Sequence, residues 1–421
     1  MRISPSSSHS CSGGRVLVLA AARFVEMPGR SHLSALPDDV VASILVLLPP
    51  REVARSRLVC RRWRALTTDH HFVRSSFLRR HAGHGHPVAG FFYNGRWGNN
   101  GDYFPIHGEV DEAAAVGERL PPDLSFISGT RSADPCQGNI KVHGSCNGLL
   151  LLSFPRPHLG AYYCVCNLLT KKFVPIVVPG CLSCCVSLAF DPSKSPHYNV
   201  ITLGDRYSVH VYYSETRSWR MAIHSDHSAC LFQDLRPARG VFWNGSVVWI
   251  ASQSLIRFFI EAEHIAKMPM PPRKKDWICG YIGESGGHLQ MIGYTKKEKV
   301  TACFDILEIK EGQSEWSVLY HVDLSRVKEM YPCIQWPTWD SRHHQHKIID
   351  YLALSPIYVI RGTGKSGQRS VLVFSIPGKV MSYNMENQEI SIVKEIALTQ
   401  PREFEHFWFS FYAYNPSLFS L

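Results

Sequence analysis

Several features of membrane, secreted and metal-dependent proteins are scarce in this sequence of 421 residues. No run of eighteen apolar residues occurs, so the sequence predicts no membrane-spanning helix. Thirteen cysteines in a chain of this length do not make a disulfide scaffold, and their odd number favours a reducing compartment. Hydrophobic residues make up 45% and charged residues 19%, which is ordinary for a globular protein with room for two or three domains.

The motifs that hold metals or phosphate are incomplete. Residues 181–184 contain a Cys-x-x-Cys pair, but no second pair lies at the spacing of a zinc ribbon. Apolar neighbours favour buried, reduced thiols here and in the Cys-Val-Cys stretch at 164–166. Residues 361–366 resemble a phosphate loop, yet valine stands at position 359, where that loop needs glycine. We interpret this stretch as a hairpin tip.

Catalytic groups show no suggestive spacing either. We find no Ser/His/Asp or paired-carboxylate arrangement, although such groups meet in space rather than along the chain. His343, His344 and His346 lie in a polar stretch. Only Asp340 and Asp350 stand nearby to complete a metal site, which favours a solvated loop. We therefore predict no catalytic residue, no metal and no cofactor.

The positive charge is concentrated in one short region. The net charge is +10, and residues 51–81 supply +7 of it through nine arginines against two acids. Residues after position 81 carry only +2, so the larger part of the chain lacks the basic surface that a nucleic-acid partner requires. The arginine-rich region is either a patch that steers an acidic partner or a solvated helical face.

A short helical unit precedes this region and overlaps it. Pro37 suits the first turn of a helix, and the acids at 38–39 lie near the positive end of its dipole. The prolines at 49–50 end this helix. The apolar residues between them form one helical stripe at i, i+3, i+4 and i+7: Val41, Ile44, Leu45 and Leu48.

The helical spacing continues as far as residue 78. Val59, Trp63 and Leu66 repeat it beside Cys60, and residues 72–78 add an apolar tail. A unit of about forty residues is too small to bury a core of its own, so a partner is expected to cover its apolar face.

The order of residues in this unit is distinctive: Leu-Pro-Asp-Asp at 36–39, Ile-Leu at 44–45, Leu-Pro at 48–49 and Arg-Leu-Val-Cys-Arg-Arg-Trp-Arg-Ala-Leu at 57–66. Over residues 34–80 it resembles the F-box motif. The resemblance implies a three-helix docking element for a Skp1-type adaptor in a cullin-based ubiquitin ligase. The implied adaptor-binding positions are Leu36, Pro37, Ile44, Leu45, Leu48, Pro49, Val59, Cys60 and Trp63.

Two alternatives remain open for this unit. The helical pattern alone fits any small bundle, and Trp63 is either a plain core aromatic or a residue whose edge also faces a partner. Ser43 stands where the family usually has glutamate, which we expect to weaken docking.

Strand signals dominate from about residue 88 onward. Turn glycines stand at Gly148, Gly245, Gly287 and Gly378, separated by 97, 42 and 91 residues. These separations approximate two, one and two periods of roughly 45 residues, the length of a four-stranded propeller blade. The alternatives are a β-sandwich and an irregular β domain.

A second resemblance supports the propeller. Residues 145–150, Ser-Cys-Asn-Gly-Leu-Leu, and residues 167–175, Asn-Leu-Leu-Thr-Lys-Lys-Phe-Val-Pro, are similar to the F-box-associated, kelch-like domain of plant F-box proteins. Leu168 replaces the proline of the usual Asn-Pro-Thr-type turn, which is expected to loosen it. In that family the domain recruits the protein to be ubiquitinated.

We therefore predict an α+β multidomain protein with a three-helix F-box and a mainly-β, propeller-like domain of about six to seven blades. The expected boundaries are a disordered leader at 1–30, the F-box at 31–81, a linker with a candidate first blade at 82–139 and the β domain at 140–421.

The predicted function is the substrate-recognition subunit of a Skp1–cullin–F-box ligase, which is not an enzyme itself and binds a target that the sequence does not name. It is expected in the cytoplasm, the nucleus or both, with no nucleic-acid or membrane partner. The alternatives are a scaffold that binds Skp1 without cullin and an enzyme built on a propeller.

Overall fold

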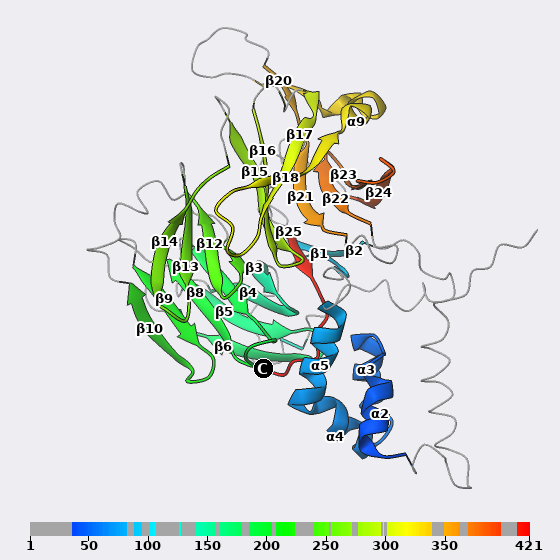
Figure 1. Ribbon diagram of the computed structural model, residues 1–421, viewed down its shortest axis with the longest axis vertical. Coiled ribbons are helices and arrows are strands. Elements are labelled where there is room, and N and C mark those ends of the chain that lie inside the picture. The colour runs from blue at the N-terminus through cyan, green and yellow to red at the C-terminus, as the bar shows by residue number, and fades with distance from the viewer. Residues whose placement is uncertain are drawn as a thin grey trace, which may run out of the picture.

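A small helical unit is joined to a ring of β-sheets (Figure 1). The computed structural model describes residues 36–81, 88–94, 102–106, 126–127, 140–156, 160–178, 185–203, 208–223, 240–251, 254–271, 277–295, 298, 301–338, 349–362, 369–396 and 411–421. The prediction of helices followed by a propeller-like domain is confirmed.

The helical unit contains one more helix than expected. Its elements are α2 (Asp38–Leu45), α3 (Pro50–Ser56), α4 (Arg61–Thr68) and α5 (His70–His81). The stretch predicted as an apolar tail forms α5, which buries Phe72, Val73 and Phe77. The three-helix element of the resemblance is thus present and extended by α5.

Prolines set the boundaries of the first two helices. Pro37 is the N-cap of α2 rather than a residue of its first turn, and its carbonyl accepts a hydrogen bond from the Val41 backbone at 3.1 Å. Pro49 caps α3, and Pro50 is its first helical residue, where the missing N–H costs nothing. The two prolines therefore start α3 as well as following α2.

Five four-stranded antiparallel sheets follow in sequence as blades. The first contains β3 (Lys141–Cys146), β4 (Leu149–Arg156), β5 (Gly160–Asn167) and β6 (Lys172–Ile176). The second contains β7 (Cys185–Phe190), β8 (Tyr198–Leu203), β9 (Val209–Tyr213) and β10 (Ser218–Ile223). The third contains β11 (Val241–Trp243), β12 (Ser246–Ile250), β13 (Leu255–Phe259) and β14 (His264–Met268).

The remaining two complete blades lie later in the chain. The fourth contains β15 (Ile278–Ser285), β16 (His288–Tyr294), β17 (Cys303–Ile309) and β18 (Ser317–Asp323). The fifth contains β21 (Ser355–Ile360), β22 (Val371–Ile376), β23 (Lys379–Asn384) and β24 (Ile390–Glu395). Between them lie α9 (Ser325–Met330), η4 (Pro332–Ile334) and the pair β19 (Gln335–Thr338) and β20 (Ile349–Leu352). In Figure 1 this insertion lies at the end of the molecule far from the helical unit.

The sixth blade closes the ring with strands from both ends of the β-rich region. β25 (Phe411–Tyr414) pairs with β1 (Gly90–Tyr93), which also pairs with β2 (Asp102–Pro105). Pairing an early strand with a late one in the same blade joins the two ends of the ring. The β-rich region is thus a six-bladed propeller, within the predicted six to seven blades.

The predicted turn glycines mark the blades, with one shift in phase. Gly148, Gly245 and Gly287 lie between the first and second strands of their blades, all with positive φ. The Asn244–Gly245 pair has φ of 45° and 72°, and a type I′ turn requires positive φ at both of its central residues. Gly378 instead lies between the second and third strands of the fifth blade. The four turn glycines are therefore not equivalent, because Gly378 occupies a later turn of its blade than the other three.

Ion pairs join neighbouring blades. Arg257 of the third blade donates to Glu311 of the fourth at 2.7 and 3.2 Å, and its guanidinium stacks 4.4 Å from the centre of the Trp243 ring. Arg361 of the fifth blade donates to Glu308 of the fourth at 3.0 and 3.3 Å. Arg361 therefore has a structural contact, whereas residues 363–366 of the phosphate-loop-like stretch lie outside the described residues.

The cysteines in the described part of the first blade are buried. Cys164 and Cys166 lie on one face of β5, and burial raises the pKa of Cys164 to about 12 and that of Cys166 well above its usual value. Both are free thiols, as predicted. Cys181, Cys184 and residues 343–346 fall outside the described residues.

Within the described ranges, no cluster of three His, Cys, Asp or Glu side chains has the geometry of a metal site. No helix in those ranges has the length and apolar character needed to span a membrane.

Candidate adaptor-docking surface

The apolar stripe expected on α2 is divided between two faces of the helix. Val41, Leu45 and Leu48 are buried in the core of the helical unit. Ile44, their predicted neighbour on the stripe, points outward with 38% of its surface exposed. The interior and the outer surface of α2 are therefore both apolar.

Ile44 lies on an outer apolar stripe that the sequence analysis missed. Val40 and Leu47, four residues before and three after it, are 38% and 58% exposed. Leu58, in the turn after α3, is 88% exposed. Singly exposed apolar side chains are normal, but Val40 and Ile44 on one face of α2, with Leu47 in the turn that follows, indicate a surface suited to a partner. The i, i+4, i+7 spacing was the available signal.

Trp63 is a core residue with limited access to solvent. It is 7% exposed and packs in the same cluster as Val41 and Leu45. Cys60 caps α4, because its sulfur accepts a hydrogen bond from the Trp63 backbone N–H at 3.4 Å. These two motif positions therefore shape the helical unit, whereas Ile44 lies on its surface.

The remaining motif positions lie around the start of the helices. Pro37 and Pro49 are exposed, and Leu36 and Val59 are half-buried. Arg62 of α4 donates to the Leu36 carbonyl and, at 2.7 Å, to an oxygen of Asp38. These two hydrogen bonds hold the residues at the start of α2 against α4.

Of the nine arginines in the helical unit, Arg51, Arg57, Arg62 and Arg80 are half-buried and the other five are exposed. Arg57 and Arg80 are partly buried and donate to the backbone carbonyls of Thr67 at 2.7 Å and Pro416 at 3.2 Å. Burial lowers the pKa of Arg80 to about 10. The exposed group comprises Arg55, Arg61, Arg64, Arg74 and Arg79. Only the exposed arginines can act on an approaching partner.

Ser43, which stands in place of the family's usual glutamate, bonds to its own helix. Its hydroxyl donates to the Asp39 carbonyl at 2.8 Å and is exposed. It therefore presents no charge beside the outer stripe.

A cavity lies on the propeller axis. The first strand of each complete blade and β25 surround a cavity of about 110 Å³. Each strand contributes to its wall, among them His143, Leu188, Phe242, Glu284, Tyr358 and Ala413. His143 shares a 2.7 Å hydrogen bond with the Ser153 hydroxyl. The cavity is small beside typical ligand pockets of about 300–1,000 Å³.

The fold and surface define a class of protein: a helical docking module with an outward apolar stripe, joined to a six-bladed β-propeller. Residues 33–79 match the F-box-like family. The helical unit is an F-box-like domain, and the resemblance seen in the sequence is confirmed. F-box proteins are generally non-catalytic adaptors.

Two curated F-box proteins are similar to this chain over most of their length. The chain is 28% identical over 353 residues to F-box protein At5g07610 of Arabidopsis thaliana, covering 77% of this chain and 80% of the relative. It is 26% identical over 325 residues to F-box protein At5g49610 of the same organism, covering 71% and 82%. A chain of the nidogen/laminin complex aligns with a TM-score of 0.37 at 10% identity, covering 78% of this chain and 96% of that one.

Proposed function

We propose that this protein is the substrate-recognition subunit of a Skp1–cullin–F-box ubiquitin ligase. The F-box-like domain docks a Skp1-type adaptor, and the propeller presents a target protein. The observation that carries the proposal is the outer stripe of α2, which is apolar within the domain that matches the F-box-like family.

The chemistry of the stripe fits a protein partner. Val40, Ile44 and Leu47 present apolar surface in a row, and burial of such surface stabilises association by roughly 25 cal/mol per Å². Exposed arginines such as Arg61 and Arg64 on the nearby α4 attract an acidic partner and raise its association rate. Arginine also bonds carboxylates through two parallel N–H groups.

The proposed mechanism needs no reacting group from this chain. A receptor that holds a target lysine near a ubiquitin carrier raises their effective concentration, and catalysis by the assembly follows from proximity. The propeller suits this role because its connecting loops are free to vary without disturbing the blades. We propose that the protein acts in the cytoplasm, the nucleus or both, where such ligases work.

A reconstitution with purified components tests the proposal. The full chain is mixed with Skp1 and cullin, and complexes are separated by size-exclusion chromatography. We expect a ternary complex that is lost in Ile44→Glu and retained in Met221→Glu, a matched change at an exposed residue of β10. Failure of the wild type to bind Skp1 would refute the proposal. Capture of Skp1 without cullin would favour a scaffold outside the ligase.

A further inference from the structure

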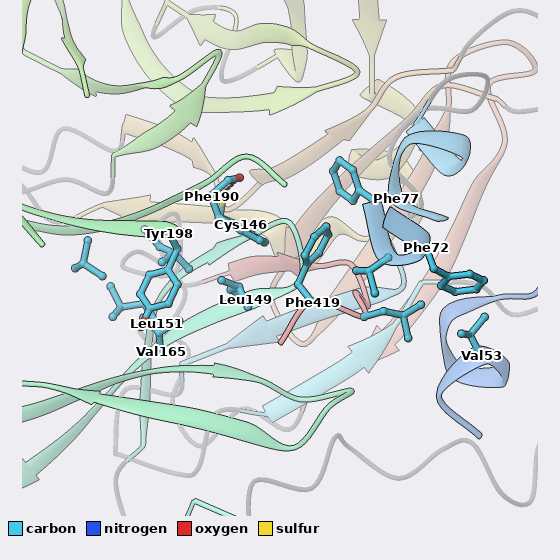
Figure 2. Close-up of a cluster of buried hydrophobic side chains, with 14 of the residues drawn as sticks. Val53, Phe72, Phe77, Cys146, Leu149, Leu151, Val165, Phe190, Tyr198 and Phe419 are labelled. Carbon is cyan, nitrogen blue, oxygen red and sulfur yellow. Dashed lines mark hydrogen bonds between the residues drawn. The ribbon is translucent and has the colours of Figure 1, made fainter. Parts of the chain in front are cut away.

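The segment that follows β25, residues 415–421, leaves the propeller and contacts the helical unit. Phe419 is buried in the cluster that also contains residues of α5 and of the first two blades (Figure 2). Its ring lies 5.9 Å from that of Phe77 on α5 and 5.3 Å from that of Phe190 on β7, edge to face in both cases. One side chain therefore packs against both parts of the molecule.

The backbone of this segment is held by a buried amide of the first blade. The side-chain nitrogen of Asn167 donates to the carbonyls of Phe419 at 2.7 Å and Ser417 at 3.1 Å. The side-chain oxygen of Asn167 accepts from the Leu169 backbone at 2.9 Å. The Ser417 hydroxyl lies within 3.3 Å of the same nitrogen, and because Asn167 is fully buried, its amide would lose all three acceptors if the segment moved away.

The helical unit holds the same segment from the other side. Arg80 of α5 donates to the Pro416 carbonyl at 3.2 Å. At the outer edge, Lys172 of β6 donates to the Ser420 hydroxyl at 2.6 Å, and this contact is exposed. The segment thus has polar contacts with α5 and with the first blade in addition to the shared aromatic packing.

A turn of the first blade fits closely against the segment. Gly148 has a φ of +91°, and a Cβ atom placed on it would lie 2.2 Å from the Ser417 hydroxyl oxygen and 2.8 Å from the Asn415 carbonyl oxygen. The equivalent Asn-Gly turn of the third blade is open. A Cβ on Gly245, whose φ is +72°, would approach only Lys194, at 3.7 Å. Gly148 is therefore constrained by the segment as well as by its backbone conformation.

The closure of the ring brings these pieces together. β1, which follows α5 in the chain, lies beside β25, and Gly90 pairs with Tyr414. The segment that leads from α5 and residues 415–421 consequently meet the sixth blade at the same end of its strands. In Figure 1, α5 is the helix beside the propeller, and α2 lies on its far side.

We propose that residues 415–421 lock the F-box-like domain onto the propeller, so that the adaptor-docking stripe and the target-presenting domain form one rigid body. This inference rests on the proposed function, because a fixed spacing between adaptor and target is what the lock supplies. The residues that position the two parts are Phe419, Asn167, Arg80 and Gly148.

Distance measurements on the full chain test the lock. Dyes on noncanonical amino acids at exposed Arg64 of α4 and exposed Glu215, between β9 and β10, report the separation of the two parts by single-molecule energy transfer. The wild type is expected to give one narrow distribution. Phe419→Ala and Gly148→Ala should broaden it at least about twofold. Gly245→Ala strains the same kind of turn without a clash against residues 415–421, and it should leave the distance distribution narrow. Phe419→Met should keep most of the packing of Phe419 and give a distribution close to that of the wild type.

Each outcome decides the proposal. Narrow distributions in both Phe419→Ala and Gly148→Ala would overturn it. Loss of cooperative unfolding in both variants would also overturn it, because the segment would then be needed for folding rather than for positioning. Skp1 capture by Phe419→Ala should equal that of the wild type, since the α2 stripe is untouched. The distance measurement needs no adaptor, so a wild type that fails to bind Skp1 refutes the proposed function and leaves the lock standing.

Discussion

Ile44 and Leu45 are neighbours in sequence, but they lie about 100° apart around α2, so one faces solvent and the other faces the core. Leu45 is 2% exposed in the core of the helical unit, whereas Ile44 is 38% exposed on the outer stripe. Both positions belong to the F-box motif, yet the structure gives them different environments. Loss of packing and loss of docking should therefore be separable by substitution at these two residues.

Leu45→Ala should lower stability, and Ile44→Ala should lower adaptor affinity. Truncation of a buried leucine typically costs about 2–5 kcal/mol, while a surface change usually stays within about 0.5 kcal/mol. We expect Ile44→Ala to keep the unfolding midpoint of the wild type and to weaken Skp1 binding by about 1–2 kcal/mol if it is a binding anchor. Denaturant unfolding and calorimetric titration measure the two effects. An Ile44→Ala protein that binds normally would remove the stripe from the interface.

Charge reversal at Arg61 and Arg64 should slow association with an acidic adaptor. Both side chains are exposed on α4, where they act over a screening length of about 8 Å at physiological salt. The double variant Arg61→Glu, Arg64→Glu is expected to reduce the association rate roughly tenfold at low salt and much less at high salt. Lys267→Glu, at an exposed residue of β14, is the control and should change the association rate little. Equal losses at both salt concentrations would contradict electrostatic steering.

The sequence predicted the order of elements but could not predict which face of α2 is buried. Val40, Ile44 and Leu47 have the same helical periodicity as the core residues Val41, Leu45 and Leu48. A periodic pattern identifies an apolar face without stating what covers it. The sequence predicted one stripe of Val41, Ile44, Leu45 and Leu48, and packing in the core of the helical unit separates Ile44 from the other three.

The positioning segment had no signal in the sequence. Its contacts join residues far apart in the chain, such as Asn167 with Phe419 and Phe77 with Phe419. Turn glycines, by contrast, depend on local backbone conformation, and their positions could be predicted from the sequence. Gly378 nevertheless lies in a different turn of its blade from the other three. Local geometry was therefore predictable, whereas the contact between the two domains was not.

Glu311→Gln should reduce stability at neutral pH and have little effect in acid. Burial opposes ionisation of Glu311, but hydrogen bonds from Arg257 and Asn244 outweigh it and lower its pKa. A lowered carboxyl pKa stabilises the fold above the unfolded value of 4.5, and this stabilisation is lost as pH falls through the folded value. Because Glu311 is half exposed, we expect Glu311→Gln to lower the free energy of unfolding at neutral pH by about 1 kcal/mol or less. Thermal unfolding of both proteins at neutral pH and at acid pH checks this, and a difference that persists in acid would contradict it.

His143 should make the fold less stable as pH falls from about 6.5 to about 4. Burial, with a smaller contribution from Lys141, lowers the pKa of His143 from 6.5 to about 4. Between these two pH values the unfolded chain binds a proton at this histidine and the folded chain does not. The free energy of unfolding therefore falls by up to about 3 kcal/mol. His143→Gln should flatten the dependence of the unfolding midpoint on pH in this window, and His197→Gln, at an exposed histidine, should not. If both variants retain the slope of the wild type, other groups destabilise the propeller in acid.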